Sequence, residues 1–110
     1  MSIFETKIKK GQRFEFGKNW QGFLSRLTDE RIRIAESSII EMLGIDNLNG
    51  KKVLDIGSGS GLFSLAARKL GAEISSFDYD PESVTCTKEL RSRYMPNDQD
   101  WVVQKGSVFR

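Results

Sequence analysis

The sequence contains no histidine and only one cysteine among its 110 residues. Without histidine, the chain itself can supply neither a serine–histidine–aspartate triad nor a histidine general base. The usual zinc sites need several cysteine or histidine ligands, which one cysteine and no histidine cannot supply, so we expect no metal. Cys86 cannot form an internal disulfide, which is typical of the reducing cytoplasm, and we interpret it as a small buried residue rather than a nucleophile.

Long apolar runs are also absent, and the charge is nearly balanced. No stretch approaches the ~20 apolar residues of a membrane helix, and the N-terminus lacks the apolar segment of a signal peptide. Seventeen basic against 15 acidic residues give a net charge of +2, which is no clear signal for nucleic acid. With 29% charged and 38% hydrophobic residues, the sequence predicts one globular domain at most, cytoplasmic and not bound to a membrane.

The chain alternates predicted helices and strands from residue 28 onward. Thr28 is the expected cap of a helix with apolar residues at a period of 3.6, and Gly44 is its expected end. Asp80 before Pro81 is interpreted as the cap of a later helix. The predicted helices are 28–43, 62–70 and 81–94, and the predicted strands are 52–56, 72–77 and 101–104. Such alternation with short connections favours an α/β fold with a parallel sheet and right-handed crossovers.

The chain is organised around the glycine-rich segment that follows the first predicted strand. Gly57, Gly59 and Gly61 stand at alternate positions between that strand and a helix. Glycine permits positive φ and lets a ligand lie against bare backbone, and a helix start offers unpaired N–H groups. Such a unit is typical of nucleotide binding, but a dinucleotide loop would need glycine at position 62, where Leu62 stands. The observed pattern is D-x-G-x-G-x-G, beginning at Asp55.

Residues 55–61, Asp-Ile-Gly-Ser-Gly-Ser-Gly, resemble motif I of the class I S-adenosylmethionine-dependent methyltransferases. The resemblance implies a Rossmann-like three-layer sandwich with a parallel sheet, truncated here to the strand order 3-2-1 and preceded by one or two N-terminal helices. We therefore interpret residues 28–110 as the first half of the cofactor-binding domain. Residues 1–27 are interpreted as an N-terminal arm with a short helix. A carboxylate beside the turn suits this ligand, which carries a sulfonium, an ammonium and a carboxylate but no pyrophosphate.

A second acid strengthens this interpretation. Asp78 ends the second predicted strand, 21 residues after Gly57 (78 − 57), where a carboxylate can accept hydrogen bonds from ribose hydroxyls. The resemblance implies that Tyr79 packs near the adenine, and that Ser107 stands where many members carry an aspartate. It also suggests that Arg31 pairs with the cofactor carboxylate. The predicted cofactor-binding residues are Asp55, Gly57, Ser58, Gly59, Gly61, Asp78, Tyr79, Ser107 and Arg31, and the catalytic residues are unknown.

The resemblance implies a methyltransferase that uses S-adenosylmethionine and moves its sulfonium methyl group to a nucleophilic acceptor by in-line displacement. We expect a small-molecule acceptor. Acceptor-binding residues lie largely after the fourth strand in this family, so the 110-residue chain alone is expected to be inactive. Two alternatives stay open: a non-catalytic methyltransferase-like binding module, and a nicotinamide-dependent oxidoreductase, against which Leu62 and Asp55 argue.

The strand order has a further consequence for the first strand. In the order 3-2-1, strand 52–56 lies at an edge, because its far side would pair with a fourth strand. Val53, Leu54 and Ile56 are apolar, and no proline or inward charge protects this edge. Exposed edges of this kind template pairing with other chains, so we expect self-association or loose packing there.

Overall fold

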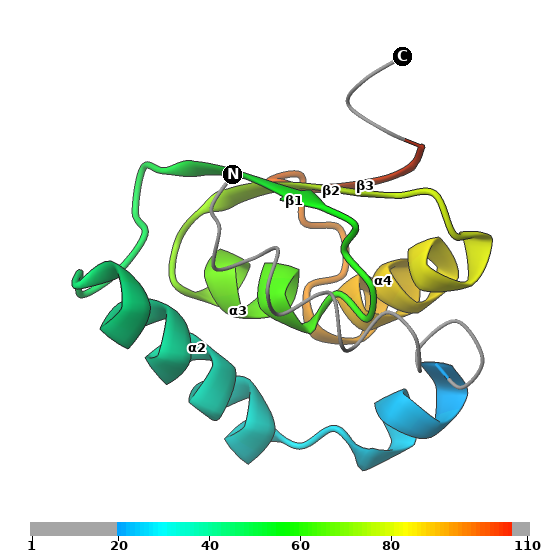
Figure 1. The fold of residues 1–110 in the computed structure, drawn as a ribbon, viewed down its shortest axis with the longest axis horizontal. Coiled ribbons are helices and arrows are strands. Elements are labelled where there is room, and N and C mark those ends of the chain that lie inside the picture. Colours follow the sequence, from blue (N-terminus) through cyan, green and yellow to red (C-terminus); the bar gives the residue numbers. More distant parts are fainter. Residues whose placement is uncertain (1–19, 107–110) are drawn as a thin grey trace.

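The computed structural model describes residues 20–106, and its elements follow the predicted alternation. A helical segment at residues 20–26 precedes the elements of the α/β unit (Figure 1). These are α2 (Asp29–Leu43), β1 (Lys52–Ile56), α3 (Leu62–Lys69), β2 (Glu73–Asp78), α4 (Pro81–Tyr94) and β3 (Trp101–Lys105).

The caps that the sequence suggested are present. The Thr28 side chain accepts a hydrogen bond from the Arg31 backbone N–H, and Gly44 ends α2 in the left-handed conformation. Asp80 caps α4 through the Glu82 N–H. Local capping chemistry therefore fixes both helix starts.

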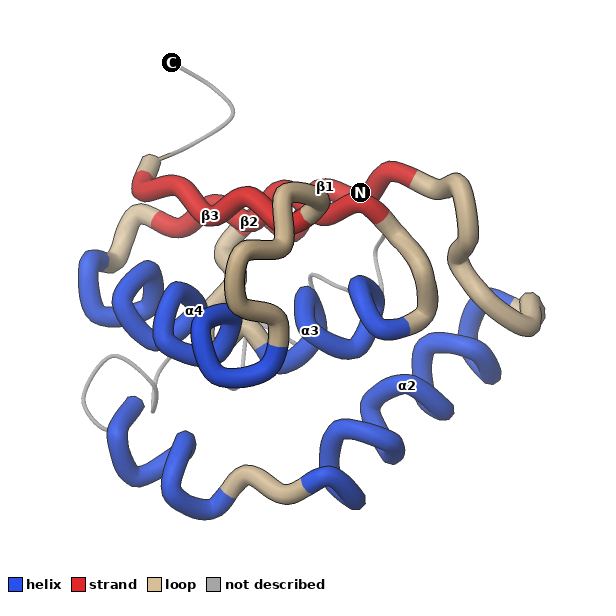
Figure 2. Tube along the Cα trace, turned by 180° about the vertical axis from the view of Figure 1, so that it is seen from behind, coloured by secondary structure: helices blue, strands red, loops and turns tan. Residues whose placement is uncertain are grey.

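The three strands form one parallel sheet in the order β1-β2-β3, which is 3-2-1 read from the other edge. Both crossovers advance across the sheet in the same direction, so right-handed connections place α3 and α4 on the same face. Figures 1 and 2 show this arrangement, with α2 lying beyond α3. The predicted α/β fold and strand order are confirmed, and within residues 20–106 β1 is an edge strand. Pairing of this edge with a second chain stays a prediction.

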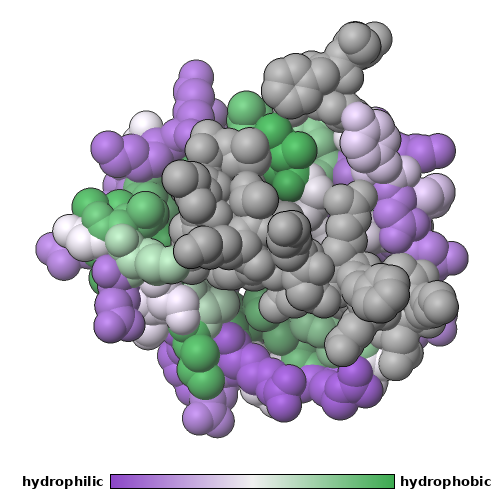
Figure 3. Space-filling model, in the orientation of Figure 1, coloured by the Kyte–Doolittle hydropathy of each residue, from purple (hydrophilic) through white to green (hydrophobic). Residues whose placement is uncertain are grey.

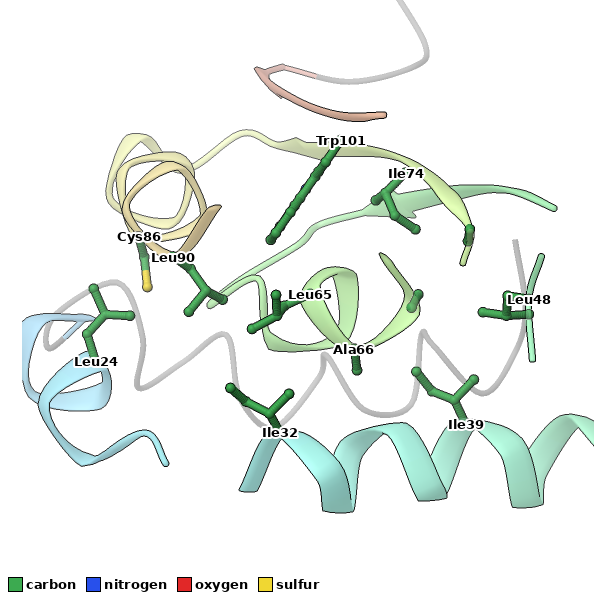
Figure 4. Close-up of a cluster of buried hydrophobic side chains, with 12 residues drawn as sticks. Leu24, Ile32, Ile39, Leu48, Leu65, Ala66, Ile74, Cys86, Leu90 and Trp101 are labelled. Carbon is green, nitrogen blue, oxygen red and sulfur yellow. The ribbon is translucent and has the colours of Figure 1, made fainter. Parts of the chain in front are cut away.

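The core lies between the sheet, α3, α4 and the inner face of α2 (Figure 4). Ile32 and Ile39, two turns apart on α2, are both 1% exposed. The fully buried side chains that meet them or lie above them include Leu65, Ala66, Leu90 and Trp101.

Some apolar residues remain outside this core. Met42 and Leu43 continue the apolar period of α2 but are exposed. The reason is length: α2 has 15 residues against eight in α3, about 22 Å against 12 Å, so the end of α2 extends past its partner. Leu54 and Val102 are exposed because they alternate with residues that face the helices. Figure 3 shows that green hydrophobic side chains also lie between purple hydrophilic ones on the face in view.

One further finding concerns membranes. Within residues 20–106, no helix combines the length and apolar character that crossing a bilayer requires.

Candidate functional site

The glycine-rich segment folds back over the end of β2. The backbone N–H groups of Gly57 and Ser58 both donate to the Phe77 carbonyl, at 2.6 and 3.0 Å. Gly57 and Gly59 have φ values of 75° and 60°, a region in which side chains other than glycine are strained. The predicted reason for these two glycines, a turn with positive φ, is therefore confirmed.

Gly61 has an additional role in packing. Its φ is 87°, and a Cβ added there would lie 2.9 Å from Thr87 Cγ2 and 3.1 Å from Thr87 Cα. The absence of a side chain thus lets the start of α3 approach the middle of α4. Gly61 therefore ends the turn and also allows α3 and α4 to pack closely against each other.

Asp78 lies directly against the turn. Its Oδ2 accepts a hydrogen bond from Gly59 N–H at 2.9 Å, and its Oδ1 accepts one from Asp80 N–H at 3.0 Å. The Asp78 carbonyl also accepts from Gly106 N–H at 2.7 Å, at the end of β3. The carboxyl ends of all three strands therefore converge on one acid and one glycine turn, which is where α/β sheets bind ligands.

Asp55 lies below the turn, on the helix-covered face of the sheet, and is fully buried. Its carboxylate accepts a hydrogen bond from the Ser64 hydroxyl of α3. The Ser64 hydroxyl also contacts the Ser76 hydroxyl at 2.7 Å, and Trp101 Nε1 donates to Ser76 at 3.0 Å. Sequence reasoning missed these three partners. The available signal was a serine on the buried side of each of two otherwise core-forming elements.

Side chains of helix α4 form hydrogen bonds with residues of the glycine turn. The hydroxyls of Ser58 and Thr87 are 3.1 Å apart, and Thr87 donates to the Gly59 carbonyl at 3.2 Å. Cys86 Sγ donates to the Ser60 carbonyl at 3.4 Å. Burial raises the pKa of the Cys86 thiol to about 12, so the thiol stays protonated and unreactive near neutral pH. Cys86 is thus a small buried residue, as expected, whereas the contact made by Thr87 was not foreseen.

The remaining predicted residues have fewer described contacts with the turn. Tyr79 is the residue after Asp78, and its side chain is largely exposed, at 65%. Arg31 is exposed in the first turn of α2, and no hydrogen bond or ion pair described for residues 20–106 joins its side chain to the glycine turn. Ser107 lies outside the described residues. Trp20 Nε1 donates to Glu82 at 2.8 Å, so the segment 20–26 is attached to the first turn of α4.

A parallel α/β sheet, a glycine turn without the dinucleotide spacing, and an acid at the end of the neighbouring strand define the class I methyltransferase type of cofactor-binding domain. Residues 37–108 match the model of the family described as Ribosomal protein L11 methyltransferase (PrmA). This match covers about two thirds of the chain, and the chain belongs to that family.

Individual relatives agree with the family match. The chain is 46% identical over 66 residues to the ribosomal protein L11 methyltransferase of Alteromonas mediterranea, an alignment that covers 51% of this chain and 22% of that protein. It is 35% identical over 82 residues to the enzyme of the same name from Photobacterium profundum, covering 66% of this chain and 28% of the relative. The Aliivibrio salmonicida relative is 37% identical over 70 residues, covering 54% and 24%. The chain thus spans about a quarter of the length of these relatives.

The names of these relatives correct one prediction. Each is named as a methyltransferase of ribosomal protein L11, which is a protein and not a small molecule. The expectation of a small-molecule acceptor is therefore wrong. The acceptor-binding residues of this family lie largely after the fourth strand, so the sequence of this chain gave no information about the size of the acceptor.

Proposed function

We propose that this chain forms the cofactor-binding half of an S-adenosylmethionine-dependent methyltransferase whose acceptor is ribosomal protein L11. Residues 28–110 would then be the first half of the methyltransferase domain, with residues 1–27 as a preceding arm. The family match over residues 37–108 and the names of the relatives support the activity and the acceptor. The cytoplasm is part of the proposal, since the only cysteine is a free thiol.

The observation that carries the proposal is the contact between Asp78 and the glycine turn. The 2.9 Å hydrogen bond from Gly59 N–H to Asp78 brings the predicted ribose acceptor against the backbone that a ligand would approach. An acidic side chain in this position favours a ligand with vicinal hydroxyls over one that presents only phosphate. Leu62 at the start of α3, in place of the third glycine of a dinucleotide loop, supports the same choice.

The residues present fit S-adenosylmethionine. Gly57 and Gly59 supply bare backbone with positive φ, and Asp78 supplies a carboxylate at the strand ends. Tyr79, largely exposed beside this acid, is available to pack against an adenine ring. When bound, the cofactor supplies a methyl group already activated on a sulfonium. The chain's own residues are therefore needed to orient and hold it rather than to generate a nucleophile, which agrees with the lack of histidine.

The activity can be tested on the protein that contains this chain, with purified ribosomal protein L11 and S-adenosylmethionine carrying a labelled methyl group. We expect label on ribosomal protein L11, and none on an unrelated basic protein of similar size. Binding of S-adenosylhomocysteine without any transfer of label would contradict the activity and favour the non-catalytic module. Binding of NADH but not of S-adenosylhomocysteine would favour the oxidoreductase.

A further inference from the structure

The hydrogen bonds that end on Asp55 run in one direction. Indole Nε1–H only donates, and at the other end the Ser64 hydroxyl donates to the Asp55 carboxyl group, so the direction is fixed at both ends of the series. The Ser64 hydroxyl has a single proton and donates it to Asp55, so it can only accept from Ser76. The Ser76 hydroxyl is therefore the donor in the bond between the two serines. Ser76 in turn accepts from Trp101 Nε1. The protons all point along the path from Trp101 through Ser76 and Ser64 to Asp55.

We call Trp101, Ser76 and Ser64 the relay. Together with Asp55, at which the relay ends, these residues come from four different elements. Trp101 belongs to β3, Ser76 to β2, Ser64 to α3 and Asp55 to β1. All four side chains are essentially unexposed. Figure 4 shows the Trp101 ring lying between the sheet and α3. Buried polar groups are costly unless satisfied, and consecutive hydrogen bonds in a dry interior strengthen one another.

Asp55, at which the relay ends, lies just before the glycine turn. Asp55 is the last but one residue of β1, and the glycine turn starts two residues later at Gly57. An apolar residue could fill the Asp55 position without requiring any partner, so the buried carboxyl group and the two hydroxyls that lead to it are not explained by packing alone. A carboxylate held in one orientation here fixes the end of β1, and with it the origin of the turn.

We propose that Trp101, Ser76 and Ser64 are positioning residues that hold the Asp55 carboxylate, and through it the glycine turn, in the geometry that receives the cofactor. This inference rests on the proposed function, because the ligand used to test it is S-adenosylhomocysteine. The relay acts as one unit: its effect reaches the turn only through the bond from Ser64 to Asp55.

A double-mutant cycle separates a unit from independent packing contributions. In the protein that contains this chain, Ser64→Ala is expected to weaken binding of S-adenosylhomocysteine about tenfold, the scale of a hydrogen bond to a charged group. Ser76→Ala acts one bond further away and should weaken binding about threefold. The double variant should bind about as weakly as Ser64→Ala alone, because the path is already broken. Affinities that multiply to a loss of about thirtyfold would overturn the relay.

Ser83→Ala is the matched control. Ser83 is also fully buried and also donates to a carboxylate, at 3.2 Å, but that carboxylate belongs to the helix cap Asp80. We expect its affinity for S-adenosylhomocysteine to stay within about twofold of wild type, because the Ser83 hydroxyl bonds to the helix cap and not to Asp55. An equal loss in Ser83→Ala and Ser64→Ala would mean that any buried hydroxyl matters, which contradicts a specific relay.

The Trp101 indole provides a readout that a purely structural role would not move. Its Nε1–H resonance, assigned with Trp101→Phe, should shift when S-adenosylhomocysteine binds to wild type and should not shift in Ser64→Ala. If Ser64→Ala does not fold, Trp101→Phe keeps an aromatic ring in the core but removes the indole N–H donor together with part of the ring volume, and it should lower affinity about threefold. An unchanged affinity in a folded Ser64→Ala or Trp101→Phe protein would overturn the inference alone. A wild type that binds no S-adenosylhomocysteine would instead overturn the proposed function.

Discussion

Two buried regions of this molecule are built from opposite chemistry. The layer between α2 and α3 is apolar, with Ile32, Ile39 and Ala66 almost completely buried. The region under the carboxyl ends of the strands is equally buried but polar, and its buried members include Asp55, Ser58, Ser60, Ser64, Ser76, Asp78 and Thr87.

The difference shows where the fold is stabilised and where it is adapted for binding. Apolar contacts contribute stability without directional demands, whereas each buried polar group requires a partner with good geometry. Within residues 20–106, most of the fully buried polar side chains lie toward the end of the sheet that carries the glycine turn. Substitutions in the apolar region should therefore change stability, and substitutions in the polar region should change ligand affinity.

The largest effect is expected from removing core volume in the apolar region. Ile39→Ala leaves a cavity where α2 packs against the rest of the core, and should lower the free energy of unfolding by about 3 kcal/mol. Ile34→Ala is the control: it lies on the same helix but is 58% exposed, and should change stability by about 0.5 kcal/mol or less. Urea unfolding measures both. Similar losses in the two variants would contradict the packing described for α2.

A comparable effect is expected where the two regions meet. Gly61→Ala combines positive φ with a Cβ 2.9 Å from Thr87, and should cost about 2–3 kcal/mol of stability. Gly50→Ala has a similar φ of 77° but nothing within 4 Å of the added Cβ, so it should cost only about 1 kcal/mol. Thermal unfolding of both variants isolates the packing contribution. Equal costs would mean that α3 and α4 do not meet closely at Gly61.

A smaller effect concerns the ion pair that joins α3 to the loop before β3. Burial raises the pKa of Asp98, but hydrogen bonds from Arg68 and from the Asp100 N–H, with the charges of Arg68 and Arg91, outweigh it and hold this pKa below its usual value. A lowered folded-state pKa contributes stability above the unfolded pKa of about 4 and loses it as pH falls further.

Asp98→Asn should therefore lower stability at pH 7 by at most about 1 kcal/mol, since solvent screens the partly exposed Arg68. The difference between wild type and variant should shrink as pH falls below about 4. Urea unfolding between pH 2.5 and pH 7 measures it. A difference that grows in acid would show that the sign is wrong.

The smallest effect is expected from thiol chemistry. Cys86 is buried in the polar region, and a pKa of about 12 leaves almost no thiolate at pH 8. The native protein should not react with a disulfide reagent on a timescale of minutes, whereas urea-unfolded protein should react at once. Raising the pH should not increase native labelling until the protein unfolds. Rapid labelling of the native protein at pH 8 would contradict the burial of this helix face.

Much of this architecture could be predicted because its signals are local. Each helix cap acts on the end of its own helix, as at Thr28, Gly44 and Asp80. The glycines of the turn likewise indicate, by their identity alone, where the backbone has a positive φ. The partners inside the polar region could not be predicted in the same way. Ser64 and Ser76 are 12 residues apart, and Ser58 and Thr87 are 29 apart, so their meeting depends on how α3 and α4 rotate against the sheet.

The most direct test of the account is a calorimetric titration with S-adenosylhomocysteine. Asp78→Ala in the protein that contains this chain should weaken binding by about 1.5–3 kcal/mol, because it removes a carboxylate from the end of β2. Asp80→Ala, the control, removes the helix cap two residues later and should lower stability by about 1 kcal/mol while leaving affinity unchanged. An unchanged dissociation constant in Asp78→Ala would contradict the assignment of this polar region to the cofactor.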